Sequence, residues 1–143
     1  MNTCALVRMS IIGLAIYFLS PAAHARSTHL IEPEPVTINC HLPAEEMNEA
    51  ILKGGAARKW VAIEQMKGVT ELKYVKGNNK HLLIVEVSYT ADTFAITYKD
   101  SVNLNYSVTN EGTRRIHPRP IGWMKNLSSD IQLAANNLCS HPH

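Results

Sequence analysis

The sequence has little excess of either charge, and this shortage argues against two classes of protein. It contains 14 Lys and Arg residues against 12 Asp and Glu residues. The basic residues are scattered, and Arg114-Arg115 is their only notable pair. A nucleic-acid-binding domain shows a basic patch or stripe, and a protein that binds an anionic membrane surface shows a polybasic cluster. The sequence therefore predicts neither nucleic acid nor a membrane surface as the partner.

The sequence also lacks the short motifs of common enzymes and metal sites. It has no His-x-x-x-His or Cys-x-x-Cys spacing, no nucleophile elbow and no glycine-rich phosphate loop. Its acids gather between residues 45 and 49, where the dipole of an expected helix explains them. The tail Cys139-x-His141-x-His143 has the ligand types of a soft-metal clip, although a disulfide at Cys139 is favoured. We therefore expect no cofactor, no metal and no catalytic residues.

The N-terminal segment has the pattern of a signal peptide. Arg8 supplies a positive charge, Ile11–Leu19 is a short apolar run, and Ala23–Ala25 fits the small-x-small cleavage rule. The apolar run is shorter than the roughly 20 residues that span a bilayer, which argues against an uncleaved membrane anchor. No Cys lies at the cleavage point, which argues against a lipoprotein. We expect cleavage after Ala25 and a periplasmic or secreted protein.

The few cysteines agree with export. Cleavage removes Cys4 and leaves Cys40 and Cys139, near the two ends of the remaining chain. An oxidising compartment permits a disulfide between them. Closing a loop of about 100 residues stabilises a fold by roughly 4 to 5 kcal/mol in the chain-entropy model. We expect this disulfide, and the alternative is two free thiols.

The spacing of apolar residues predicts one domain after residue 25. Alternating prolines in Glu32–Pro35 disfavour a helix or a central strand, so residues 26–39 should form an extended leader before a domain over 40–143. Helical spacing and strict alternation distinguish the expected helices from the strands. The expected elements are a helix over 43–59, strands over 60–65, 69–75, 81–89 and 94–99, and a helix over 121–138.

Turn lengths predict how the middle strands pair. A four-residue loop after Tyr89 pairs Tyr89 with Phe94, and one after Lys76 pairs Tyr74 with Leu83. Both hairpins then place their apolar side chains on one face, and a slip by one residue would invert a strand. We expect an α+β fold: a two-layer sandwich in which an antiparallel meander of three or four strands carries an N-terminal and a C-terminal helix on one face.

A set of polar and aromatic residues remains that could line a pocket between the sheet and the helices. In this hypothesis two residues supply polar contacts, namely Arg58 and His117, and two supply apolar area, namely Trp60 and Trp123. His81 begins the buried-face row of its strand. The structural alternatives are a hydrogen-bonded histidine at a strand end and tryptophans that only pack. The candidate ligand- or partner-binding residues are Arg58, Trp60, His81, Asn103, His117 and Trp123.

The order of several short motifs resembles a family of small exported bacterial proteins, some of them lipoproteins, that have no assigned function. The motifs are Ala50-Ile51-Leu52, Arg58-x-Trp60, the Gly68 turn, His81 to Tyr89, Tyr98, Ser101-x-Asn103-Leu104, Ile116-His117 and Trp123-x-x-x-Leu127-x-x-x-Ile131. The resemblance covers about residues 47–133. It implies a bacterial envelope protein with an α+β fold and brings no catalytic residues. The sequence departs from the family at Pro120–Gly122, where the family carries Tyr-Asn before its Trp.

These observations favour a small exported binding module whose partner is another envelope protein or a small ligand. One alternative is an envelope enzyme or an enzyme inhibitor, the latter presenting residues 100–120 as a protruding loop. Another is a structural subunit that assembles through the face of Leu82 and Ile84 or through an unpaired strand edge.

Overall fold

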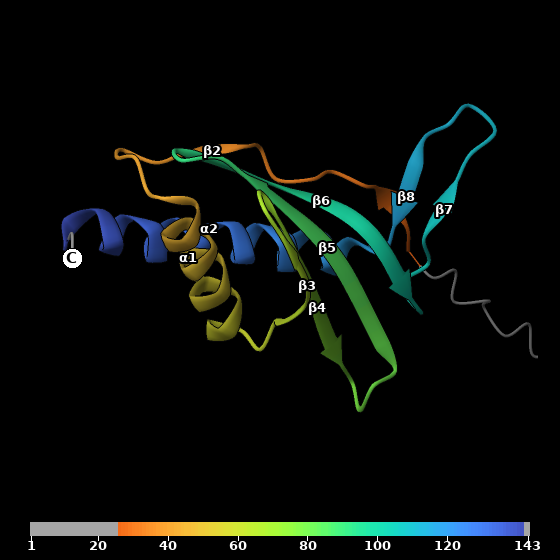
Figure 1. The fold of residues 1–143 in the computed structure, drawn as a ribbon. Helices are drawn as coiled ribbons and strands as arrows, with labels where there is room; N and C mark the ends of the chain where they lie inside the picture. The colour runs from red at the N-terminus through yellow and green to blue at the C-terminus, as the bar shows by residue number, and fades with distance from the viewer. Residues whose placement is uncertain (1–25, 142–143) are drawn as a thin grey trace, which may run out of the picture.

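A computed structural model describes residues 26–141 (Figure 1), so the expected signal peptide over 1–25 and His143 lie outside the described residues. The elements are β1 (Thr28–His29), β2 (Val36–Thr37), α1 (Ala44–Ala57), β3 (Val61–Met66), β4 (Val69–Lys76), β5 (His81–Tyr89), β6 (Thr93–Val102), β7 (Ser107–Val108), β8 (Arg114–Ile116) and α2 (Pro118–Ser140). Among the described helices, none is long and apolar enough to cross a membrane.

The fold is α+β, as expected. Five antiparallel strands form one sheet in the order β2-β6-β5-β4-β3, and β1, β8 and β7 form a second, smaller sheet. The predicted registers are confirmed: Tyr89 pairs with Phe94, and Tyr74 pairs with Leu83. The β7–β8 hairpin projects away from the main sheet (Figure 1). Alternation and loop length were therefore sufficient to align the central meander.

Both helices contribute to one core with the larger sheet. Met47 and Ile51 of α1, together with Leu127 and Ile131 of α2, are fully buried. At the helix crossing, a Cβ on Gly54 would lie 2.6 Å from the backbone Cα of Ile131. Gly54 therefore allows the backbones of α1 and α2 to approach closely. A Cβ on its neighbour Gly55 would instead lie 3.3 Å from the side chains of Leu72, in β4, and Trp60.

Two chain segments differ from their predicted roles. Residues 26–39 are extended as expected, but they supply β1 and β2, which pair with β8 and β6, and Ile38 is buried. Unpaired backbone at the edges of β8 and β6 accounts for this pairing. Helix α2 begins at Pro118, three residues before the expected 121, because proline suits the first helical turn.

The predicted disulfide is present. Cys40 and Cys139 are bonded across a sequence separation of 99 residues. The bond joins the chain just before α1 to the last turn of α2. Because the sulfur of Cys139 is consumed in this bond, the alternative of a metal clip formed by Cys139, His141 and His143 is wrong.

Candidate functional site

All six predicted site residues line two adjoining hollows. The first, of about 260 Å³, is lined by Lys76, Gly77, His81, Asn103, Leu104, His117, Arg119 and Trp123. The second, of about 420 Å³, is lined by Ala57, Arg58, Lys59, Trp60, Tyr74, Lys76, Trp123 and Asn126. Lys76 and Trp123 line both hollows. We therefore treat the two hollows as one site, which we call the groove.

The N-terminus of α2 forms one wall of the groove. The first backbone N–H groups of a helix have no partner within the helix. Here the N–H of His117 donates to Leu104 O at 2.8 Å, and the N–H of Arg119 donates to His117 Nδ1 at 3.2 Å. Pro118 and Pro120 have no N–H. The helix end therefore presents no unsatisfied backbone donor, and recognition of a ligand here falls to side chains.

His81 and Asn103 also line the first hollow, at the start of β5 and just after β6. His81 Nδ1 lies 2.9 Å from Asn103 O, and Asn103 Nδ2 donates to Lys80 O at 2.7 Å. Asn103 has a φ of +56°, a conformation that asparagine tolerates better than most residues. These bonds hold the β4–β5 turn against the segment after β6 and fix the imidazole ring in place.

An aromatic row crosses the groove. The rings of Trp60 and Tyr74 lie 5.1 Å apart between centroids, and those of Tyr74 and Trp123 lie 5.1 Å apart in an edge-to-face arrangement. Trp60 is only 4% exposed, so it belongs to the core and forms the floor of the second hollow. Trp123 is half-buried, and Lys76 Nζ lies 5.8 Å from its ring centroid. Trp123 is therefore the tryptophan that can offer its surface to a ligand.

Arg58 is already engaged by a carboxylate. Its Nε donates to Asp130 Oδ2 at 2.6 Å, which ties the loop after α1 to the middle of α2. The terminal nitrogens of the guanidinium remain for a ligand. Arg58 therefore contributes donors to the groove but little net charge.

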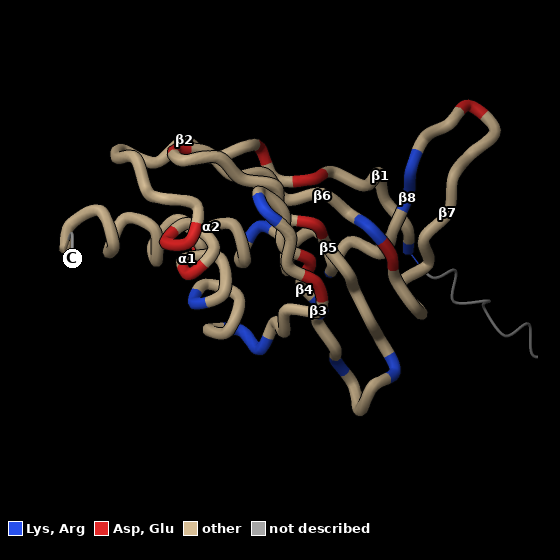
Figure 2. Tube along the Cα trace, viewed as in Figure 1, with Lys and Arg blue, Asp and Glu red and all other residues tan. Residues whose placement is uncertain are grey.

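The groove is cationic. No Asp or Glu lines either hollow, and within residues 26–141 the side chains of Lys59, Lys76 and Arg119 have no carboxylate partner. Figure 2 shows basic residues at the β4–β5 turn and after α1, and acidic residues on α1. The groove therefore carries positive charge that no carboxylate of the described residues neutralises.

Sequence reasoning missed Lys59, Lys76 and Arg119. Two of them had a signal. Lys76 pairs with His81 in the predicted register, and Arg119 precedes Trp123 by four residues on one helix. Lys59 had none, because its place follows from the path of the chain after α1, where it adopts a φ of +68°.

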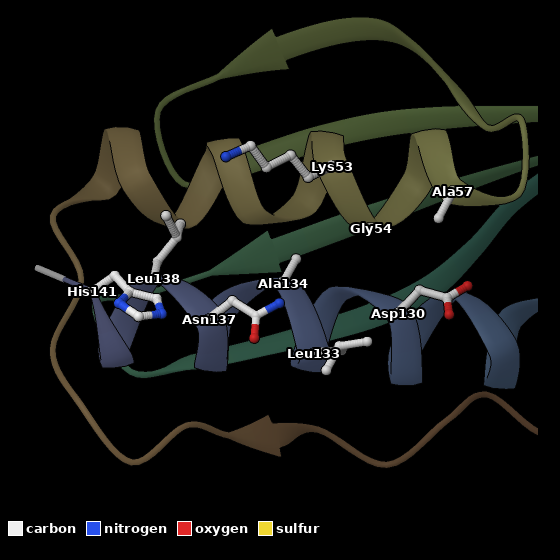
Figure 3. Close-up of a pocket in the computed structure, with 9 residues that line it drawn as sticks. All are labelled: Lys53, Gly54, Ala57, Asp130, Leu133, Ala134, Asn137, Leu138 and His141. Carbon is white, nitrogen blue, oxygen red and sulfur yellow. The ribbon is translucent and has the colours of Figure 1, made fainter.

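The groove differs from two other hollows. One, of about 390 Å³, lies between α1 and α2 (Figure 3) and is lined by residues such as Gly54, Ala57 and Leu133. Another contains Tyr98 and Arg114. Neither brings together the predicted residues. Within residues 26–141, no three His, Cys, Asp or Glu side chains are grouped to hold a metal ion.

Two side chains outside the groove, Tyr98 and Arg114, have raised pKa values. Burial raises the pKa of Tyr98, whose hydroxyl lies 2.9 Å from Ser101 Oγ. The carboxylate of Glu32 accepts hydrogen bonds from the guanidinium of Arg114, and these bonds raise the pKa of Arg114. Glu32 also accepts a hydrogen bond from the backbone N–H of Tyr98 at 2.9 Å. Glu32 therefore fastens residues 26–39 to the edge of β6, which is a structural role.

Comparisons with family models, with curated proteins and with solved structures find no match to this chain. The functional interpretation consequently depends on the groove itself.

Proposed function

We propose that this protein is a small exported binding module of the bacterial envelope that holds an anionic ligand in the groove. One observation carries this proposal: three cations without carboxylate partners, Lys59, Lys76 and Arg119, line the groove together with the half-buried Trp123, and no acid lines it. Unpaired positive charge in a concavity attracts anions, and an aromatic ring supplies apolar contact area.

The composition of the groove favours binding over catalysis. Neither hollow is lined by a Ser, Thr or Cys side chain that could act as a nucleophile beside the histidines. His117 Nδ1 is occupied as the cap of α2, and His81 Nδ1 is occupied by Asn103. The alternative of an envelope enzyme therefore lacks an assembled nucleophile and base in this site.

Export is supported by the signal-like N-terminus, by the disulfide and by the resemblance to small exported bacterial proteins. The protein isolated from its own host should have the mass of residues 26–143 less two hydrogens. A mass that includes residues 1–25, or that shows two free thiols after alkylation, would contradict export with disulfide formation.

The binding proposal is tested by nuclear magnetic resonance of the ¹⁵N-labelled protein titrated with trigalacturonate, polyphosphate and a polyglutamate peptide. At least one anion should shift the indole signal of Trp123 and the amide signals of Lys76 and Arg119. The double variant K76A/R119A should lose the shifts, whereas K67A, which removes a cation at the β3–β4 turn, should keep them. The proposal fails if no anion shifts these signals.

A second candidate function, assembly with a second copy, is favoured by the unpaired edge of the larger sheet. Within the described residues, β3 has no strand on its outer side, and its Val61, Ile63 and Met66 side chains are 56%, 44% and 53% exposed. Such an edge can pair with another strand. Analytical ultracentrifugation should then show a dimer that Ile63→Lys dissociates, and a monomer at high concentration would exclude this candidate.

A further inference from the structure

The two histidines of the groove present opposite hydrogen-bonding groups. The carbonyl oxygen of Asn103 can only accept, so we assign the proton of neutral His81 to Nδ1, which leaves Nε2 as an acceptor. The N–H of Arg119 can only donate, so Nδ1 of His117 is unprotonated and Nε2 carries the proton. Within the described residues, neither Nε2 atom has a hydrogen-bond partner.

The surroundings leave space beside the acceptor nitrogen. Gly77 lines the same hollow, and a Cβ there would lie 3.3 Å from Cδ2 and 3.9 Å from Nε2 of His81. Gly77 has a φ of +66°, which a residue with a side chain rarely adopts. The turn between β4 and β5 therefore keeps this side of the imidazole unobstructed.

A ligand that satisfies this groove needs three chemical features. An acid group matches Lys76, Arg119 and the Nε2–H of His117. A hydrogen-bond donor, such as a hydroxyl, matches Nε2 of His81. An apolar face matches the ring of Trp123. A simple carboxylate or phosphate dianion only accepts hydrogen bonds, so it leaves His81 without a partner.

An extended acidic peptide fits the groove less well. Peptides in extended form commonly bind by adding a strand to an exposed sheet edge. The strands that reach the groove are β4 and β5, and these pair with each other up to Lys76 and His81. β4 is also paired with β3, and β5 with β6. Within the described residues, β3 pairs with β4 only as far as Lys73, so the unpaired edge of β4 beside the groove spans just residues 74–76. This edge is shorter than the about five or six residues of a typical strand.

We infer that the ligand is an acidic sugar, in which a hydroxyl donates to His81 Nε2, the carboxylate accepts from His117 Nε2–H near Lys76 and Arg119, and the ring lies on Trp123. This inference rests on the proposed binding function and names its ligand class. The first hollow, of about 260 Å³, is smaller than the roughly 300 to 1,000 Å³ of pockets for drug-sized ligands. It suits one sugar unit, and a chain of units continues past Trp123 into the second hollow.

Calorimetry with matched probes tests the inference. Galacturonate carries both acid and hydroxyls, galactose lacks the acid, and cyclohexanecarboxylate lacks the hydroxyls. His81→Asn keeps the donor to Asn103 O and removes Nε2, and His117→Asn keeps a good helix cap and removes the Nε2–H donor. Each variant should bind trigalacturonate roughly tenfold more weakly, as expected for the loss of one hydrogen bond. His81→Gln, which restores an acceptor near Nε2, should recover part of the loss.

Controls separate the role of each group. Cyclohexanecarboxylate should bind the parent protein and His81→Asn with equal affinity, because it has no hydroxyl that could donate to His81 Nε2. His29→Asn, at an exposed position in β1, should bind trigalacturonate like the parent. Trigalacturonate binding more tightly than galacturonate supports a polysaccharide as the source, and equal affinity supports a free sugar acid.

Three results would overturn the inference. If the polyglutamate peptide shifts the groove signals and the uronates do not, the groove binds anions but the ligand class is wrong. If His81→Asn binds trigalacturonate as tightly as the parent, the hydroxyl contact is wrong. If none of the anions binds, both this inference and the proposed function fail.

Discussion

At the scale of single residues, His117 has a structural role as well as a place in the groove. Its Nδ1 accepts the N–H of Arg119 and caps α2. His117→Ala should lower the free energy of unfolding by about 1 kcal/mol, the usual cost of losing a cap, whereas His117→Asn should leave it nearly unchanged. Urea unfolding of the three proteins measures this. Equal destabilisation by Ala and Asn would show that the cap is not what His117 contributes.

The candidate site could be predicted in part at this scale. Polar and aromatic residues at strand ends and next to the second helix identified His81, His117 and Trp123, which do line one hollow. Trp60 was equally plausible from the sequence, but packing against Tyr74 buries it. Lys59 escaped prediction because side-chain charge alone does not show which of several scattered lysines a loop brings to a concavity.

At the scale of secondary-structure elements, the crossing of α1 and α2 depends on Gly54. A Cβ there would lie 2.6 Å from backbone atoms of Ile131, so Gly54→Ala must push the helices apart. Overpacking of this kind costs about 1 to 3 kcal/mol, and alanine returns at most about 1 kcal/mol through helix propensity. We expect net destabilisation in thermal unfolding.

The matched control for this crossing is Gly122→Ala in α2. A Cβ at Gly122 meets nothing within 4 Å, so only the gain in helix propensity remains and the melting temperature should rise. Similar changes of melting temperature in both variants would show that close approach of the helices is not the reason for a glycine at position 54.

The elements themselves were predictable where the information is local. Strand alternation and short turns aligned β4, β5 and β6 correctly. The pairing of residues 26–39 was not predictable, since β1 meets β8 and β2 meets β6 across long stretches of sequence. The start of α2 was placed three residues late because Pro118 and Pro120 obscure a helical pattern, although proline is compatible with a first turn.

At the scale of the whole molecule, the disulfide restricts most of the chain that the structure describes. Cys40 and Cys139 are 99 residues apart, and a loop of about this length stabilises a fold by roughly 4 to 5 kcal/mol in the chain-entropy model. The double variant C40S/C139S should lose most of this stabilisation, measured as the free energy of unfolding in urea. A reducing agent should destabilise the parent protein but not the variant. Unchanged stability on reduction would contradict this role.

At this scale we also predict that the unpaired cations of the groove make ligand binding depend on salt. Unpaired cations line the groove, whereas carboxylates such as Glu45 and Glu64 lie on other elements (Figure 2). Raising NaCl from about 0.1 M to about 1 M shortens the screening length from roughly 10 Å to 3 Å. The affinity for trigalacturonate should therefore fall steeply in calorimetry.

This dependence belongs to the groove and not to the net charge, because the chain as a whole carries only a formal +2. K76Q/R119Q should bind weakly at low salt and show a flatter dependence on NaCl. K67Q lowers the net charge at the β3–β4 turn and should keep the parent slope. If K67Q weakens the dependence of affinity on NaCl as much as K76Q alone does, the anion responds to the overall charge of the protein. Local electrostatic complementarity would then not be the source of the affinity.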